Sequence, residues 1–331
     1  MHSTRNKLLH LLAPGEFLSG TELGSSLGIS RAAVGKHIEA LKGLGLDVFS
    51  VRGKGYKLSE PLSLLSHELI AEFFHQQREL DEYRNIRNTF QLDVLNVVDS
   101  TNTYIKQNIA DLVQGATCIA EAQSAGRGRH GREWVSPFAS SIYLSMYWCF
   151  GGGYQTLSGL SLVIGLAVNR TLNRFGISNG RLKWPNDIYI NMQKIAGILI
   201  EVEGSVGDEV HCVIGVGLNV NLPTNITGID QPFTDLQSHA QQDIINRNAL
   251  TAQLMLDIQS ALTLFEKLGL TPFISEWEAL NVFAQKEITL LIGQQEITGI
   301  CTGIDQQGAL RVLVEGESKT FHGGEISVRA K

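Results

Sequence analysis

Glycine and arginine alternate in one short stretch of the chain, Gly126-Arg127-Gly128-Arg129-His130-Gly131-Arg132. Glycine allows the backbone to wrap closely around a ligand, and arginine recognises phosphate or carboxylate through paired N–H donors. The stretch matches no P-loop, and neither a helix nor an acidic ribose contact follows its glycines, as a dinucleotide-binding fold requires. It therefore predicts an anion-binding loop, and a solvated basic loop or an RNA-binding patch is the alternative.

Two lysines, an amide and an acid gather around a predicted turn further along the chain. The segment reads Lys183-Trp184-Pro185-Asn186-Asp187, and Lys194 follows it in Lys194-Ile195-Ala196-Gly197. These groups suit a nucleoside triphosphate with its Mg²⁺ ion. The alternative is a plain hairpin, since Pro-Asn-Asp favours a turn and lysines often only solvate a sheet edge.

Two further segments place polar groups at the ends of predicted strands. Asp99-Ser100-Thr101-Asn102 lies where a strand meets a helix, so its side chains either cap that helix or face a ligand at its N-terminus. Gly215-Val216-Gly217-Leu218-Asn219-Val220-Asn221 is an apolar strand whose glycines permit close approach of a flat ligand.

The elements that must position these groups begin near residue 90. Apolar runs predict strands at residues 94–98, 117–121, 142–148, 188–190, 195–202 and 210–220. Longer periodic segments predict helices at residues 101–112, 156–175, 247–268 and 272–280. Because two strand pairs come close together without a crossover helix, we expect an α+β domain, a mixed sheet with helices on one face.

The first sixty residues have the pattern of a winged helix-turn-helix. Ser19 and Glu22 form a capping box, Gly28 ends that helix, and Ser30 begins a second helix that runs to about Lys42. Two short strands, 47–51 and 56–58, enclose a basic turn. Small and basic residues on the outer side of the second helix and in the turn predict a DNA-binding surface, although small helical clusters often bind no DNA. Its residues are Ser30, Arg31, Ala32, Lys36, Arg52 and Lys54.

Charge is divided unevenly along the 331 residues. Residues 1–60 carry eight Lys/Arg and five acids, a net charge of +3, whereas the rest of the chain carries −9. A basic head on an acidic body suggests that only the head meets a polyanion. The four cysteines form no Cys-x-x-Cys pair, and neither a secretion signal nor an apolar span is present, so we expect a cytoplasmic protein without a membrane span.

The end of the chain predicts a small SH3-like β-barrel. Short strands at residues 288–292, 296–304, 309–314 and 319–322 are joined by tight turns. A predicted helix at 62–74 and a polar segment at 76–88 form a connector behind the head. The expected domains are therefore 1–61 (winged helix-turn-helix), 62–89 (connector), 90–281 (central mixed-sheet domain) and 282–331 (barrel).

Taken in order, the motifs resemble the biotin protein ligase family over nearly the whole chain. The matching motifs are Ser-Thr-Asn, Gly-Arg-Gly-Arg-x-Gly, Lys-Trp-Pro-Asn-Asp, Lys-x-Ala-Gly-Ile-Leu and Gly-x-Gly-x-Asn. The basic head and Gly323-Gly324-Glu325-Ile326-Ser327 resemble the long bacterial form that also represses the biotin operon. His130 departs from the family pattern, where arginine is common.

The resemblance implies a role for each candidate residue. The biotin-binding residues would be Ser100, Thr101, Asn102, Gln123, Arg127, Gly128, Arg129 and Lys194. The nucleotide-binding residues would be Arg132, Trp134, Lys183, Asn186 and Asn219, with Asp187 as the Mg²⁺ ligand. Arg129 and Lys194 would be catalytic, and the loop 222–236, with Phe233 as an apolar contact, would close over the adenylate.

The implied reaction uses ATP with Mg²⁺ to convert biotin to biotinyl-5′-AMP, and then transfers biotin to a lysine of a biotin carboxyl carrier protein domain. Arg129 and Lys194 would offset the repulsion between carboxylate and triphosphate. The implied partners are that acceptor domain, operator DNA, and a second copy of the chain when biotinyl-5′-AMP is bound. The alternatives are a lipoate or octanoate ligase and a biotin-sensing repressor without catalysis.

Overall fold

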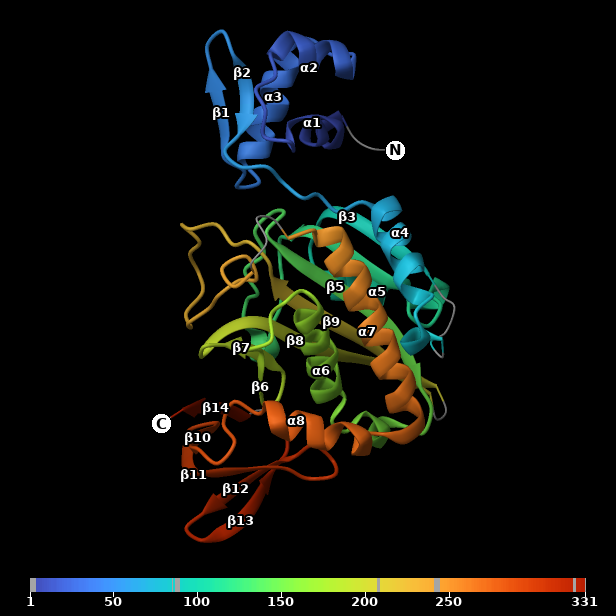
Figure 1. Ribbon diagram of the computed structural model, residues 1–331, viewed down its shortest axis with the longest axis vertical. Coiled ribbons are helices and arrows are strands. Elements are labelled where there is room, and N and C mark those ends of the chain that lie inside the picture. Colours follow the sequence, from blue (N-terminus) through green and yellow to red (C-terminus); the bar gives the residue numbers. More distant parts are fainter. Residues whose placement is uncertain are drawn as a thin grey trace.

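The computed structural model describes residues 4–84, 86, 90–206, 209–240, 245–323 and 326–330. Three units follow one another along the longest axis of the molecule (Figure 1). A small helical head with a two-stranded wing stands at one end, a large mixed sheet with its helices lies in the middle, and an antiparallel sheet closes the other end. The predicted fold class is confirmed.

The head has three helices and a wing. These are α1 (Thr4–Leu12), α2 (Gly20–Leu27), α3 (Arg31–Lys42), β1 (Val48–Val51) and β2 (Gly55–Leu58). α1 was not predicted from the sequence; its buried leucines pack against the other two helices.

Local signals set the ends of the head elements as predicted. Ser19 and Glu22 form a reciprocal capping box, and the Ser30 hydroxyl accepts a hydrogen bond from the Ala33 amide. Gly55 has φ 102°, and a Cβ there would lie 2.1 Å from the Leu18 carbonyl oxygen. Only glycine therefore lets the wing pack against the start of α2.

A buried ion pair anchors the segment between head and body. Arg247 donates to Glu121 (2.7 Å) and to the Ser63 carbonyl (2.9 Å), while Glu121 accepts the Leu65 amide (2.6 Å). These bonds keep residues 63–65 out of a helix. The helix expected from residue 62 therefore begins only behind Ser66, as α4 (His67–Arg78).

Apolar side chains also join the head to the central unit. Phe138 and Ala139, which precede a strand of the large sheet, are buried in the same cluster as the leucines of α1. The head is therefore packed on the body as well as tethered to it.

The central sheet has seven strands in the order β3-β4-β5-β9-β8-β7-β6. They are β3 (Leu92–Val98), β4 (Thr117–Gln123), β5 (Ser141–Phe150), β6 (Arg181–Lys183), β7 (Asp187–Ile190), β8 (Gln193–Val206) and β9 (Glu209–Asn219). Only the β3–β4 pair is parallel, so the sheet is mixed as predicted. The short β6 was not predicted.

The expectation that all helices lie on one face of this sheet was wrong. α6 (Leu160–Arg174) and α7 (Arg247–Leu268) pack together on one face, but α5 (Thr101–Asn108) packs on the other. Successive residues of a strand point to opposite faces. In β5, Trp148 belongs to the main core and its neighbour Tyr147 to the small cluster beneath α5.

The last unit is an antiparallel five-stranded sheet behind α8 (Ile274–Leu280). Its strands are β10 (Glu287–Ile292), β11 (Gln295–Ile304), β12 (Leu310–Val314), β13 (Glu317–Phe321) and β14 (Ile326–Ala330), in the order β13-β12-β11-β10-β14. β14 was not predicted, and Gly324 and Glu325 of the terminal motif lie outside the described residues. Within the described chain, every helix falls short of the combined length and apolar character needed to cross a membrane.

Candidate active site

A cavity of about 890 Å³ opens where β5 and β8 begin and β9 ends, beside the loop that follows β4. All four predicted motifs contribute to its wall. The predicted ligand-binding residues that line it are Ser100, Thr101, Asn102, Gln123, Arg127, Gly128, Arg129, Arg132, Trp134, Lys183, Asn186, Asp187, Lys194 and Asn219.

The polar floor of the cavity lies at the start of α5. The Gln123 side chain, rather than Ser100, caps this helix, since its Oε1 accepts from the Thr101 amide (2.9 Å) and hydroxyl (3.2 Å). The Ser100 hydroxyl makes no capping bond, although the residue is only 3% exposed. The capping alternative is therefore wrong for Ser100, which lines the cavity instead.

Asn102 is held in the floor by hydrogen bonds from two strands, β5 and β8. Its Oδ1 accepts from the Ser145 hydroxyl (2.5 Å), and its Nδ2 donates to Glu201 (2.7 Å). A Cβ on Gly215 would lie 2.4 Å from Oδ1, so only glycine leaves room for this side chain. The amide is thus oriented by the protein alone.

Arg127 connects the glycine–arginine loop to this floor. Its guanidinium pairs with Glu201 (3.1 Å) and donates to the Thr103 hydroxyl (2.8 Å). Glu201 therefore holds Asn102 and Arg127 at the same time, which joins the floor to the loop.

The glycine–arginine loop is a closed hairpin over the sheet. The Trp134 amide donates to the Gly126 carbonyl (2.9 Å), and the Gly128 amide donates to the Arg132 carbonyl (2.8 Å). The Trp134 ring lies on Gly217, where a Cβ would meet the ring at 2.5 Å. The flat surface predicted at the glycine-rich strand is therefore covered by an aromatic ring.

Two of the predicted cations are braced by neighbouring polar groups. Lys194 Nζ pairs with Asp187 (2.7 Å) and lies 5.2 Å from the centre of the Trp134 ring. Arg129 donates to Asn186 Oδ1 (3.1 Å), and Asn186 donates in turn to the Ile198 carbonyl (2.7 Å). Burial lowers the pKa of Arg129, and Asp187 partly offsets this. Both cations are therefore positioned before any anion binds.

Lys183 lies deeper and is less well compensated. Its ammonium donates to the Tyr189 hydroxyl (3.0 Å) and lies 4.8 Å from the centre of that ring. The pKa of Lys183 is lowered, and burial is the largest cause. The negative charge of Asp187 opposes the lowering. The nearby cations add to it; they are Lys194, Arg132 and Arg329. A phosphate beside this ammonium would favour its charged form.

The loop predicted to close over the ligand runs beside Lys194. The Lys194 amide donates to the Pro232 carbonyl (2.9 Å), and its carbonyl accepts the Thr234 amide (2.9 Å). Asn219 donates to the Thr234 carbonyl (3.0 Å), and Phe233 lines the cavity. The strand and the loop are thus bound to each other at the cavity wall.

Tyr189 and Arg329 are among the cavity residues that were not predicted from the sequence. Tyr189 braces Lys183, and Arg329 reaches the cavity from β14. The sequence gives a weak indication that Tyr189 lines the cavity, because this tyrosine lies between two isoleucines in a strand beside the Lys-Trp-Pro-Asn-Asp motif. Arg329 had none, because its proximity depends on where the last unit docks.

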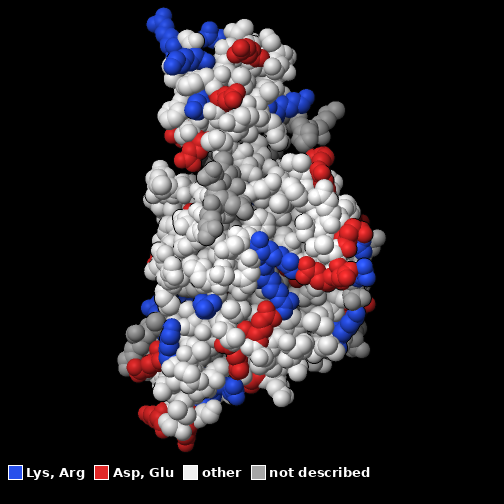
Figure 2. Space-filling model, viewed as in Figure 1, with Lys and Arg blue, Asp and Glu red and all other residues white. Residues whose placement is uncertain are grey.

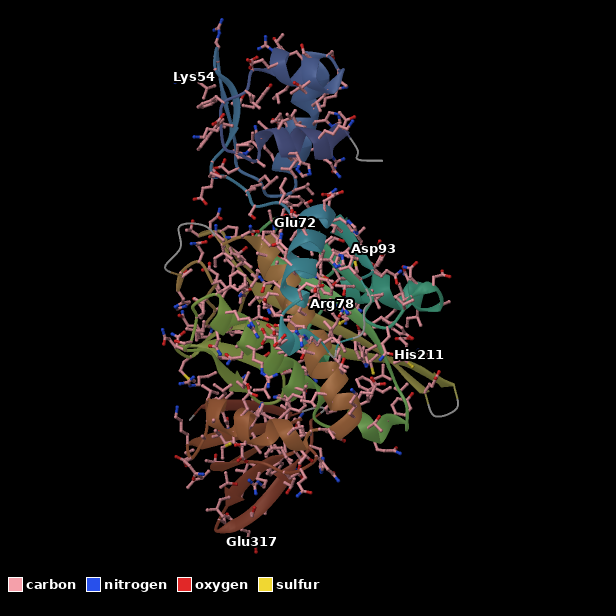
Figure 3. All side chains as sticks on the ribbon, turned by 45° about the vertical axis from the view of Figure 1, so that its right-hand side comes forward. Lys54, Glu72, Arg78, Asp93, His211 and Glu317 are labelled. Carbon is pink, nitrogen blue, oxygen red and sulfur yellow. The ribbon has the colours of Figure 1, made fainter. Side chains whose placement is uncertain are left out.

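The predicted DNA-binding surface lies at the far end of the molecule. Arg31, Ala32 and Lys36 are exposed on α3. Arg52 and Lys54 are exposed in the wing, and Figure 3 shows Lys54 at its outer tip. Several Lys and Arg side chains mark this end of the molecule in Figure 2. The head thus presents cations to solvent, whereas the cavity holds them in its wall.

Three regions of the chain match known families. Residues 94–219 match the biotin/lipoate A/B protein ligase family, residues 4–57 match a helix-turn-helix domain, and residues 286–329 match the biotin protein ligase C-terminal domain.

Relatives and a solved structure agree with these matches. The chain is 45% identical to the bifunctional ligase/repressor BirA of Escherichia coli, over 98% of this chain and 97% of that protein. It is 30% identical to the BirA of Bacillus subtilis, over 99% and 100% of the two chains. The structure of the biotin protein ligase from Aquifex aeolicus in complex with biotin and ATP matches with a TM-score of 0.64 and 29% identity, covering 73% of this chain and all of that one.

Proposed function

The chain belongs to the family of bifunctional biotin protein ligases and repressors, and we propose that its cavity joins biotin to ATP before biotin is transferred to a protein lysine. The carboxylate of biotin attacks the α-phosphate of ATP, which forms biotinyl-5′-AMP and releases pyrophosphate. The amine of the acceptor lysine then attacks the mixed-anhydride carbonyl and releases AMP. A biotin carboxyl carrier protein domain is the acceptor.

We assign biotin to the polar floor of the cavity. Ser100, Thr101, Asn102 and Gln123 offer a cluster of hydroxyls and amides, and hydrogen bonds within the protein orient the side chains of Thr101, Asn102 and Gln123. Such a prearranged cluster can bind the polar ring of biotin with little further ordering. Arg127 and Gly128 of the glycine–arginine loop line the cavity beside this floor.

We assign the carboxylate and the phosphates to the cationic side. Arg129 and Lys194 lie where two anions must approach each other, and fixed cations stabilise the charge that develops there. Lys183, Asn186, Asn219, Arg132 and Trp134 would face the nucleotide. Asp187 would hold a Mg²⁺ ion together with phosphate oxygens, since Mg²⁺ is usually bound by one or two carboxylates and the substrate's phosphates.

The observation that carries the proposal is the meeting of a fixed polar floor and partly buried cations in one cavity. ATP–pyrophosphate exchange tests it, because exchange occurs only if the adenylate forms reversibly. We expect exchange with biotin and not with lipoate or octanoate. Exchange with lipoate would identify the alternative ligase, and no exchange with any acid would identify a sensor without catalysis.

We propose that the head binds operator DNA in the cytoplasm and that biotinyl-5′-AMP strengthens this binding by pairing two chains. A single wing and helix make few phosphate contacts, so one copy should bind weakly and with strong salt dependence. Two heads on one dimer make the second contact intramolecular and raise the affinity. Ordering of residues 126–134 over the adenylate would create the partner surface. Sedimentation with and without a non-hydrolysable adenylate tests the pairing, and an unchanged mass with unchanged operator affinity would contradict it.

We also propose the domain limits 1–61, 62–89, 90–281 and 282–331. The separate sheets of the wing, the central unit and the last unit support this division.

A further inference from the structure

A group of metal-binding side chains lies at the end of the large sheet opposite the cavity. Ser141 of β5 is paired with Asn219 of β9 at the cavity, and Cys149 is paired with His211 at the other end. The two pairs are eight positions apart, and the cavity residue of β9 nearest to His211 is Gly215, four positions or about 13 Å away at about 3.3 Å per residue. Figure 3 shows His211 on the central unit, well away from the wing tip at Lys54. This group is therefore separate from the ligand cavity.

The register of β5 and β9 brings three donor atoms together. Cys149 and His211 are directly opposite each other, so their side chains share a face of the sheet. Glu209 lies two positions before His211 and therefore shares that face. The thiol, the imidazole and the carboxylate each offer one ligand atom, and all three atoms lie within 4.8 Å of one another.

A small tetrahedral ion could be bound by these three atoms after a small movement of the side chains. Zinc binds cysteine sulfur at about 2.3 Å and histidine nitrogen at about 2.0 Å, so its ligand atoms lie about 3.3–3.8 Å apart. Glu209 is exposed, so its long side chain can rotate to close the remaining gap. Cys149 and His211 are half-buried, so solvent ions can reach the group.

Tyr147 orients the imidazole. Its hydroxyl forms a hydrogen bond with Nδ1 of His211 (2.8 Å), and the two rings are stacked with an angle of 14° between them. The phenol is therefore a hydrogen-bond partner of the histidine, a usual companion of a metal-binding imidazole.

We propose that Cys149, Glu209 and His211 form a Zn²⁺ site, with Tyr147 as the positioning residue of the imidazole. One thiolate and one carboxylate neutralise the charge of a divalent ion. Thiolate and imidazole favour Zn²⁺ over Mg²⁺, so the site does not compete for the ion that accompanies ATP. Three protein ligands leave one position for water, so the ion is exchangeable. It would tie β5 to β9 at the end remote from the cavity.

The chain provides a matched control for each type of ligand. Glu203 of β8 is also paired with His211, but Lys106 already forms an ion pair with its carboxylate. Cys212 is the next residue after His211, and it is buried on the opposite face of β9. Glu203→Gln and Cys212→Ser therefore remove the same chemical groups without removing a proposed ligand.

Zinc binding to the full-length chain tests the site. The reduced, metal-free protein, without ATP or biotin, is titrated with Zn²⁺ in competition with a chromophoric chelator. We expect one equivalent of tightly bound Zn²⁺, which Cys149→Ser and His211→Gln abolish and Glu209→Gln weakens. Tyr147→Phe should weaken binding by about 10–100-fold, the usual effect of removing such a partner. Glu203→Gln and Cys212→Ser should leave the affinity unchanged.

Cobalt substitution identifies the ligands without any measurement of ligase activity. Co²⁺ in the wild-type site should give the thiolate-to-cobalt charge-transfer band, and Cys149→Ser should remove it while circular dichroism shows an intact fold. If His211→Gln does not fold, the exposed Glu209→Gln still tests the same site. Wild-type binding no tighter than that of Cys149→Ser would overturn the proposal. Equal weakening by Glu203→Gln and Glu209→Gln would overturn the ligand set.

Discussion

The cavity and the winged head both present cations, but they hold them differently. In the cavity, Lys194 pairs with Asp187, and Arg129 is bonded to Asn186. In the head, Arg31 and Lys36 project from α3 into solvent. Braced, partly buried cations stabilise charge at one fixed place, whereas exposed cations contribute small and similar terms to phosphate binding. Single substitutions should therefore have large effects in the cavity and modest effects in the head.

A buried ion pair between Glu121 and Arg247 connects the head to the part of the central sheet that carries the cavity. Glu121 and Arg247 are each only 3% exposed, and they hold both the segment behind the head and the strand β4 that leads into the cavity. Loss of this buried ion pair should therefore destabilise the protein more than loss of any surface charge.

The largest effect is expected at this junction. Glu121→Gln leaves the buried charge of Arg247 without its partner, which should lower the free energy of unfolding by about 3–5 kcal/mol. Urea denaturation measures the loss. Glu39→Gln removes the exposed pair with Lys42 and is the control, which should leave the midpoint unchanged. Equal midpoints for the two variants would show that the junction does not stabilise the fold.

The next effect tests the braced cations. Lys194→Ala and Arg129→Ala should each slow adenylate formation by about 10²–10³-fold, because each removes a positioned group that offsets repulsion between anions. Pyrophosphate exchange measures the rate, with circular dichroism to verify the fold. Lys267→Ala, at an exposed position in the last turn of α7, should keep the wild-type rate. Near-wild-type exchange in both cavity variants would remove the contrast between cavity and head.

The exposed cations of the head should show a smaller effect. Arg31→Ala and Lys36→Ala should each weaken operator binding and reduce the slope of log affinity against log salt by about one. Pyrophosphate exchange should not change. Lys42→Ala is the control, because Lys42 already pairs with Glu39. A loss of operator binding that does not depend on salt would mean that these residues act through the fold.

The smallest effect is a shift in pH dependence at Lys183. Burial lowers the pKa of this lysine. As the pH rises, Lys183 therefore loses its positive charge at a lower pH than an ordinary lysine, whose pKa is about 10.4. On the alkaline side of the pH profile, kcat/KM for ATP should fall as Lys183 loses its proton. Lys183→Arg keeps its charge, so in this variant the fall should begin at a higher pH. Protein stability should change in the opposite sense, rising over the same interval because the unfolded chain binds the extra proton. If the wild type and Lys183→Arg have the same alkaline pH profile, a group other than Lys183 causes the fall.

The contrast between head and body also explains how much the sequence predicted. The head is one continuous segment whose caps at Ser19 and Ser30 act within three residues, so its helices could be predicted from local pattern. The cavity residues also came from recognisable motifs, and the structure brings all of them to one wall. Errors occurred where the answer depended on distant partners: α5 lies on the second face, and residues 63–65 are held extended by Glu121 and Arg247.

The sequence by itself determined the order of the units, the capped ends of the helices and the residue types available to the cavity. These features depend on backbone geometry and on neighbours a few residues apart, which any sequence displays. Only the tertiary structure decided that Arg329 reaches the cavity, that Tyr189 braces Lys183, and that Cys149 meets His211. Those meetings follow from strand register and domain docking, which bury apolar surface from distant parts of the chain and leave no local signal of which side chains become neighbours.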